Sequence, residues 1–401
     1  MDIGPPLLLS GALLPDGRAV DVRINSGRIE AIGASGSLSA PDRLDLGGYL
    51  LLPAPAEAHT HLDEAFSATS EPAAETVELL QRRITEAALG GLGYGATAQR
   101  THVRIGDGHG LLRVEAALQA GQNLHGLMEL QTVALPRLLT GVAGAEGRAM
   151  LREALALGAH AVGGCPDLDP DPVGFLEFAI AQAGEHGRPL DLHTDAGDPV
   201  RFLRLAAVLG ATGTPVNLGP CAGLAELSGG ALAGAVDRLA ASGLSVTCLP
   251  QSSRCVGTGA HTGGVRPLLP VARLRAAGVA VAAGSGGLRD TANPVGRVDP
   301  LEAAFLLAAS GGLDTAAAYA AVSTVARGVL GLPPVRVDVG SPAELLAVRG
   351  ESLHGVLSGG HSRVVLHAGR VVSRTSAVRE YTDTTAPAVP RQGRGGPPDR
   401  S

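Results

Sequence analysis

The most regular feature of the sequence is a repeated pair of segments. A short apolar run ends in a glycine, histidine or polar cluster, and a longer stretch rich in Ala, Leu, Glu and Arg follows it. The short runs are typical of buried strands, and the longer stretches, such as PVGFLEFAIAQAGEHG, have the apolar period of a helix. Eight such runs occur in order along the chain: LLPAPAEAHTH, TAQRTHVRI, HGLMELQTVAL, AHAVGGCP, PLDLHTD, TPVNLGP, LSVTCLPQ and VAVAAGSG. Strands alternating with helices predict an α/β fold with a parallel sheet, and eight repeats predict a TIM-type (β/α)8 barrel.

Both ends of the chain carry a different pattern, in which short apolar runs are separated by turn residues. Hairpin turns are expected at Asp16-Gly17, Ser26-Gly27 and Ala368-Gly369. We expect residues 1–52 and 335–382 to pair in one small composite β-sandwich domain, beside a barrel that spans 53–334. The last segment, 383–401, is rich in Pro, Gly, Thr and Arg, which is typical of disorder.

The composition restricts the class of protein. Hydrophobic residues make up 45% of 401 positions, and the net charge of −6 gives no reason to expect nucleic acid as a partner. No apolar run reaches the length of about 18 residues that a membrane span needs, and the N-terminus lacks the basic start of a signal peptide. These features predict a cytoplasmic protein whose cysteines are reduced thiols.

One absence restricts the chemistry of any catalytic site. All 32 basic residues are arginine. A Schiff-base lysine and a lysine carbamate between two metals are therefore excluded. A metal site in this chain has to be built from His, Asp, Glu and Cys.

The sharpest chemical motif is His59-Thr60-His61, at the end of the first barrel run. Residues i and i+2 of a strand point to the same face, so both imidazoles are expected at the barrel mouth, where the chemistry of this fold is located. His193 ends the fifth strand and is expected at the same mouth. Neutral imidazole binds zinc and iron well, so the three histidines predict one divalent metal site.

Two aspartates follow the third histidine. Asp195 lies two residues past His193 and could share its face. Alternatively, Asp195 or Asp198 could cap the helix that is expected to begin near Pro199.

Several segments together resemble the cytosine deaminase family of the amidohydrolase superfamily. They follow the family's order over nearly the whole barrel: LLPAPAEAHTHLDEAF, RTHVRI, MELQTVALP, DLHTDAGD, VTCLPQSS and SGGLRDTANPVG. The resemblance implies that His59, His61 and His193 bind one zinc or iron ion and that Gln131 binds the substrate. It also implies a reaction in which the metal activates water for attack on a ring carbon that bears an amino group, while carboxylates move the protons.

Three proton-handling positions of that family are replaced in this chain. Ala196 stands where the family usually has a glutamate after the fifth strand. Gly219 or Pro220 stands where it has a histidine, and Gly286 falls where it has a metal-binding aspartate. Each general acid or base typically contributes roughly 10²–10⁴-fold to the rate, so losing all three would leave little ordinary deamination.

Other groups could take over these roles. Asp195 and Asp290 are candidate catalytic residues, and Cys221 is a candidate fourth ligand, although Asp290 also fits a structural segment and Cys221 a small packed residue. His102, in RTHVRI, is expected as a satisfied core histidine more than as a ligand.

Two functions fit these observations. One is a metal-dependent amidohydrolase that acts on a C–N bond of a small cyclic or heterocyclic compound, with altered or impaired chemistry. The other is a catalytically inactive protein of the same fold that binds a small molecule or supports a partner. A small molecule is the expected partner in the first case, and the Ala/Leu-rich barrel exterior is compatible with a homo-oligomer.

Overall fold

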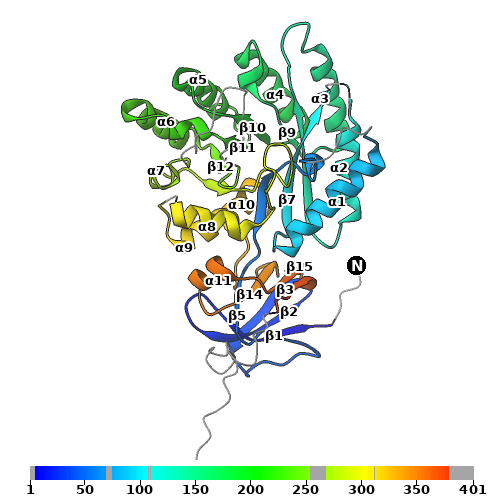
Figure 1. Cartoon of the computed structure of the whole chain (residues 1–401), viewed down its shortest axis with the longest axis vertical. Coiled ribbons are helices and arrows are strands. Elements are labelled where there is room, and N and C mark those ends of the chain that lie inside the picture. Colours follow the sequence, from blue (N-terminus) through cyan, green and yellow to red (C-terminus); the bar gives the residue numbers. More distant parts are fainter. Residues whose placement is uncertain are drawn as a thin grey trace, which may run out of the picture.

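The chain folds into two sheets of eight strands, one from its middle and one from its two ends. The computed structural model describes residues 5–68, 75–106, 108, 110–252, 268–310 and 312–378. The segment predicted to be disordered, 383–401, lies outside these residues. In Figure 1 the barrel and its helices form the upper part of the molecule and the terminal sheet the lower part.

The barrel sheet is parallel, and its strands follow the order of the chain from β6 to β13. Each predicted run contains one of them: β6 (Ala56–Thr60), β7 (Ala98–Ile105), β8 (Glu129–Pro136), β9 (Ala161–Val162), β10 (Leu190–Thr194), β11 (Val216–Pro220), β12 (Ser245–Cys248) and β13 (Val281–Ala283). A bridge between Thr60 and Gly286, just past β13, joins the two ends of the sheet. The structure thus confirms the predicted barrel.

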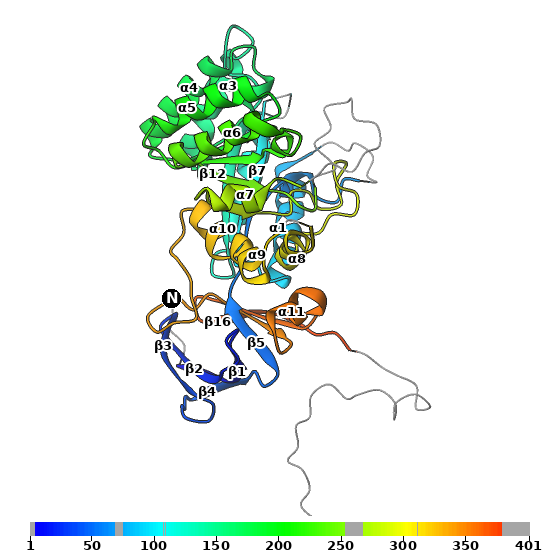
Figure 2. The same ribbon diagram turned by 90° about the vertical axis from the view of Figure 1, so that its left-hand side faces the viewer.

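Helices cover the outside of the barrel (Figures 1 and 2). Their bounds are α1 (Val77–Gly93), α2 (Leu112–Asn123), α3 (Ala145–Leu157), α4 (Pro172–His186), α5 (Pro199–Gly210), α6 (Gly229–Ser242), α7 (Val271–Ala276), α8 (Pro300–Ser310), α9 (Thr315–Val322) and α10 (Thr324–Val329). The apolar stripe of α1 shows the principle, because Leu80, Ile84 and Leu92 are buried at the spacing of one helix face. No helix in the described ranges is long and apolar enough to cross a membrane.

The two chain ends pair in one mixed sheet, as expected. Its order is β16-β15-β14-β5-β1-β2-β3, with β4 beside β1. The elements are β1 (Leu7–Leu13), β2 (Ala19–Asn25), β3 (Arg28–Ala34), β4 (Asp42–Asp45), β5 (Tyr49–Pro53), β14 (Leu345–Arg349), α11 (Leu353–Gly359), β15 (Arg363–His367) and β16 (Arg370–Thr375). The sheet has its own hydrophobic core, which includes Leu9, Val22, Leu51 and Leu366. The exact domain boundaries stay a prediction.

The first predicted run divides between the two sheets. Leu51 and Leu52 belong to β5 of the terminal sheet, whereas β6 of the barrel begins at Ala56. Pro53 and Pro55 lie at the change of sheet, where a residue without an N–H costs no ladder hydrogen bond.

A polar layer crosses the barrel interior one step below the mouth. Arg100, Gln131, Asp191 and Asn217 are all buried, and each belongs to a different strand. Arg100 and Asp191 precede His102 and His193 by two residues, so they share the inward face with these histidines but lie one layer deeper. The layer therefore forms the floor of the site at the mouth.

Candidate metal centre

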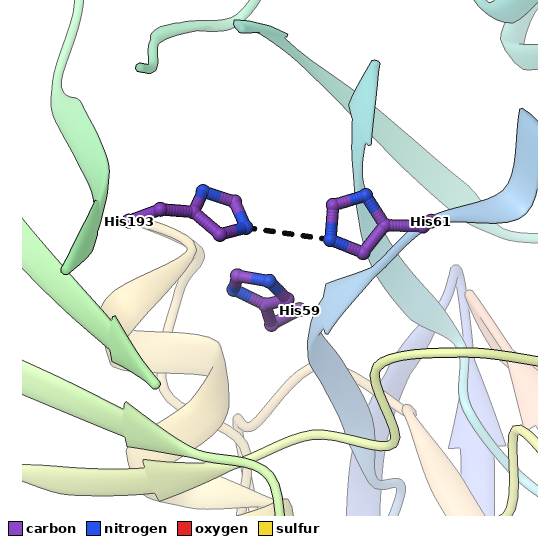
Figure 3. Close-up of side chains that lie close together, drawn as sticks. All are labelled: His59, His61 and His193. Atoms are coloured by element: carbon purple, nitrogen blue, oxygen red, sulfur yellow. Dashed lines mark hydrogen bonds between the residues drawn. The ribbon is translucent and has the colours of Figure 1, made fainter. Parts of the chain in front are cut away.

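Three histidines meet at the C-terminal mouth of the barrel (Figure 3). His59 lies in β6, His61 directly follows that strand, and His193 lies in β10. One ring nitrogen of each lies within 4.8 Å of those of the other two. Nε2 of His61 and Nε2 of His193 are 3.3 Å apart. Two nitrogens bound at 2.0–2.1 Å to one tetrahedral zinc would be about 3.3–3.4 Å apart, so this spacing fits a shared ion.

Two of the three imidazoles, those of His59 and His193, have the protonation state that metal binding needs. Burial, reinforced by the neighbouring imidazoles, lowers the pKa of His59 and of His193 well below the usual value, so both rings are neutral near pH 7. Among the described residues, neither ring nitrogen of His59 nor Nδ1 of His193 has a hydrogen-bond partner, although all three atoms are buried. Buried polar atoms are normally satisfied, so the open nitrogens of His59 fit a bound cation, whereas the nitrogen of His193 that faces His61 is Nε2.

A contact with the main chain fixes the orientation of the His61 ring. Its Nδ1 lies 3.0 Å from the main-chain oxygen of His102 in the adjacent strand β7. A carbonyl oxygen can only accept, so Nδ1 carries the proton and Nε2 keeps the open lone pair. That lone pair is on the nitrogen nearest His193.

A fourth ring, that of His102, belongs to the same cluster. It is fully buried and stacks on His59, with 3.9 Å between ring centroids. Sequence reasoning expected a satisfied core histidine, yet within the described part of the chain its ring nitrogens make no hydrogen bond. Its Nε2 lies 3.3 Å from Oδ1 of Asp191, a close contact between the two groups.

A second group that could hold a cation consists of His59, His102 and Asp191. The negative charge of Asp191 is already balanced by Arg100, whose Nη1 donates to Oδ2 at 2.7 Å. Nδ2 of Asn217 donates to Oδ1 of Asp191 at 2.8 Å. Burial alone would raise the pKa of Asp191, but His102 and Arg100 outweigh it and hold the pKa well below the usual range. A cation here would face the guanidinium of Arg100, so the three-histidine point is the better metal site.

Gln131 lies in the floor of the site. Its Oε1 accepts hydrogen bonds from Nε and Nη2 of Arg100, at 3.1 and 2.7 Å, and its Nε2 donates to the main-chain oxygen of Leu330 at 3.1 Å. The carboxamide is therefore engaged with the protein on both sides. Its predicted role in substrate binding stays a prediction.

The two aspartates after His193 have different positions. Asp198 is the N-cap of α5 and accepts hydrogen bonds from the main-chain nitrogens of Val200 and Arg201. Asp195 lines a cavity of about 230 Å³, together with Asp167, Thr194 and Phe202. The helix cap is thus Asp198, and the cavity begins at the residue that follows His193.

The remaining candidates are held by their own surroundings. Asp290 is buried and accepts hydrogen bonds from the main-chain nitrogens of Leu288 and Asn293, so it organises the loop after β13. Cys221 is fully buried, and burial raises the pKa of its thiol far above the usual value. A thiol in that state is a poor metal ligand, since the thiolate is the form that binds.

The backbone at the three replaced positions disfavours the family's side chains, by lack of space at position 219 and by a positive φ at positions 286 and 196. A Cβ at position 219 would lie 2.9 Å from the main-chain oxygen of Thr247 and 3.5 Å from Nδ1 of His59. Gly286 has φ +76°, and Ala196, which is buried, has φ +58°. Both φ values belong to the left-handed region of backbone conformation, which residues other than glycine rarely adopt.

Sequence reasoning did not single out one acid beside the centre. Asp63 follows His61 by two residues and is 1% exposed. Burial, with Glu64 adding to it and Arg113 opposing it, raises the pKa of Asp63 to about 6. Nη1 of Arg113 donates to its Oδ2 at 2.9 Å, and within the described ranges its Oδ1 has no partner. The position of this acid directly after the two histidines was the available signal.

Comparison with known proteins relates this geometry to a class. No family model matches the chain. A pterin deaminase of Rhizobium rhizogenes is 32% identical over 238 residues, which cover 56% of the chain but only 54% of that relative, about half its length. N-isopropylammelide isopropyl amidohydrolase of a Pseudomonas species is 24% identical over 412 residues, covering 93% of the chain and 98% of the relative.

A solved structure extends the comparison to the whole fold. 5-Methylcytosine deaminase from Klebsiella pneumoniae, liganded with phosphonocytosine, matches with a TM-score of 0.81 at 22% sequence identity. The match covers 94% of the present chain and 100% of the deaminase chain. A parallel eight-stranded barrel with a histidine cluster at its mouth, attached to a sheet from both chain ends, is the fold of the amidohydrolases. In sequence, the chain is similar to the pterin deaminase over about half the length of that relative and to the N-isopropylammelide amidohydrolase over nearly its whole length.

Proposed function

We propose that this protein is a metal-dependent hydrolase that cleaves a C–N bond of a small nitrogen heterocycle. The observation that carries the proposal is the convergence of His59, His61 and His193 on one point at the barrel mouth. The lowered pKa values of His59 and His193 and the open ring nitrogens of His59 support a divalent ion there, zinc or iron. Bound to them, such an ion would supply Lewis acidity and a water of lowered pKa.

The relatives support the substrate class. Their names include a pterin deaminase and an N-isopropylammelide amidohydrolase, and the structural neighbour is a 5-methylcytosine deaminase. All three names refer to nitrogen heterocycles from which an amino or alkylamino group is removed. The cavity lined by Thr194 and Asp195, in the loop that follows His193, gives room for part of such a compound. Gln131 is the proposed substrate-binding residue; substrate contact would require its carboxamide to exchange a bond with Arg100 or Leu330.

The chain's own residues have a defined part in this proposal. The protonated Nδ1 of His61, held by the oxygen of His102, keeps Nε2 available for the ion. The floor residues Arg100 and Asp191 are paired and buried, so they close the lower side of the site to water. Asp195 and Asp290 stay the proposed candidates for proton transfer.

One observation favours a second function, a protein of this fold that binds a small molecule without turning it over. Ala196, Gly219 and Gly286 stand where the family resemblance places groups that move protons. Without them, the metal centre would retain ligand binding more readily than catalysis. The two functions differ in turnover and share the metal centre.

Two measurements on the purified full-length chain test the proposal. Elemental analysis is expected to find close to one zinc or iron per chain. The metal should be lost in a His59→Ala/His61→Ala double variant and retained in His160→Asn, which changes a partly buried histidine outside the cluster. Release of ammonia or amine is then assayed with pterins, cytosines and aminotriazines. Metal with turnover supports the hydrolase, metal without turnover supports the binding protein, and absence of metal after growth in replete medium overturns both.

A further inference from the structure

Of the three proposed ligands, His61 alone has a main-chain partner on its second ring nitrogen among the described residues, and His59 is the one whose ring lies face to face with another side chain. His61 is held by the main-chain oxygen of His102 at 3.0 Å. In the described ranges no hydrogen-bond partner reaches either ring nitrogen of His59, which is 1% exposed. A metal-binding histidine almost always has a partner on its second nitrogen, because that bond fixes the orientation of the ring. The orientation of His59 therefore depends on another kind of contact.

The face of His102 provides that contact. Its ring lies 3.9 Å from that of His59, centroid to centroid, with 24° between the two planes. The other ring pairs among the four histidines meet edge-on or tilted, at angles from 45° to 89°. In a close-packed interior, rotating the ring of His59 about its Cβ–Cγ bond would drive it into His102. The stack thus restricts the one torsion that aims the nitrogens of His59.

His102 is fixed in turn from the floor of the site. Its Nε2 lies 3.3 Å from Oδ1 of Asp191, and that carboxylate accepts hydrogen bonds from Arg100 and Asn217. Oε1 of Gln131 accepts two further bonds from Arg100. All of these side chains are buried, so water does not compete for their contacts. Asp191 therefore has a fixed position from which it can orient the ring of His102.

We infer that His102 is a positioning residue of the metal centre: its ring, oriented by Asp191, holds His59 in the orientation that binds the ion. The inference rests on the proposed function, because it requires that His59 binds a metal. It differs from a role of His102 as a ligand. Among the described residues, the donor atoms of His102 group with those of His59 and Asp191, and not with those of His61 and His193.

The test is a Co²⁺ titration of the metal-free, full-length chain, read by the visible absorption bands of the bound ion and by competition with a chelator. His102→Ala is expected to bind one Co²⁺ per chain, as the wild type does, but about 10–100-fold more weakly and with shifted bands. His102→Phe keeps a flat ring against His59 and is expected to bind more tightly than His102→Leu, which has similar bulk and no flat ring. His160→Asn is the matched control and is expected to match the wild type.

Each outcome decides a separate point. Wild-type affinity and bands in His102→Ala would show that His102 positions nothing, and so would equal affinities of His102→Phe and His102→Leu. Complete loss of Co²⁺ from a folded His102→Ala, as expected for His59→Ala, would make His102 a ligand and overturn the inference. A wild-type chain that binds no Co²⁺ would overturn the metal centre itself, and this result is known before any variant is made. If His102→Ala does not fold, the Phe and Leu variants carry the comparison.

Discussion

The hydroxyl of Ser252 occupies the space that a side chain at position 286 would need. A Cβ on Gly286 would lie 2.6 Å from Oγ of Ser252. That Oγ donates a hydrogen bond to the main-chain oxygen of Ser285 at 2.7 Å, so the hydroxyl is not free to turn away. The position where the family resemblance implies an aspartate is thus built around a glycine in this chain.

We expect Gly286→Ala to lower the free energy of unfolding by about 1–3 kcal/mol, because both the positive φ and the hydroxyl oppose a side chain. Urea unfolding of Gly286→Ala, Ser252→Gly and the double variant measures the effect. The double variant should lose less than the sum of the single losses, by at least about 0.5 kcal/mol, since the two sites are in contact. Strict additivity would show that the hydroxyl is not the obstacle. For the same reason, Gly286→Asp alone should not restore a metal-binding aspartate.

The buried pair of Arg100 and Asp191 should contribute strongly to stability. Arg100→Met removes the charge that lies 2.7 Å from Asp191 and leaves a buried carboxylate without its main partner. Breaking one partner of such a pair costs about 3–5 kcal/mol. Chemical unfolding should show this loss, whereas Arg297→Gln, whose arginine is 54% exposed and pairs with Glu302, should lose less than about 1 kcal/mol. Similar losses in the two variants would contradict the importance given to burial.

Zinc should stabilise the folded chain if the three histidines bind it. A ligand at 100 times its dissociation constant adds about 2.7 kcal/mol to the free energy of unfolding when it binds only the folded state. Thermal unfolding with and without zinc should therefore show a rise in Tm for the wild type and none for His59→Ala/His61→Ala. An equal rise in both would indicate that zinc binds elsewhere.

Acid should destabilise the protein partly through His160. Burial, together with Arg188 and Arg100, lowers the pKa of His160 to about 4, and its Nδ1 accepts a hydrogen bond from the main-chain nitrogen of Thr132. Between pH 6.5 and 4 the unfolded chain holds more protons at this site, so the contribution is complete above pH 6.5 and is lost as the pH falls toward 4. The loss amounts to about 1–3 kcal/mol, because His160 is only partly buried.

The variant His160→Asn isolates this contribution. The amide oxygen of asparagine can accept the same bond from Thr132 and does not titrate. Unfolding free energies measured from pH 7 to pH 4.5 should fall less steeply in the variant. Parallel pH profiles would show that His160 titrates normally.

Local patterns in the sequence determined the order and type of the elements. Each of the eight apolar runs contains one barrel strand, and the turns at Ser26-Gly27 and Ala368-Gly369 have the positive φ angles expected of them. Period and turn chemistry are properties of a few adjacent residues, so a single sequence displays them. The shared face of His59 and His61 follows from the same two-residue period.

Only the tertiary structure decided which side chains meet. His102 resembled an ordinary core histidine in its own segment, but the adjacency of β6 and β7 stacks it on His59. Gln131 contacts Arg100 and Leu330, which are 31 and 199 residues away along the chain. The space at Gly286 is limited by Ser252, from a different loop of the barrel. These contacts arise from strand register and barrel closure, which bring distant residues together, and no local pattern of hydrophobic and polar positions records them.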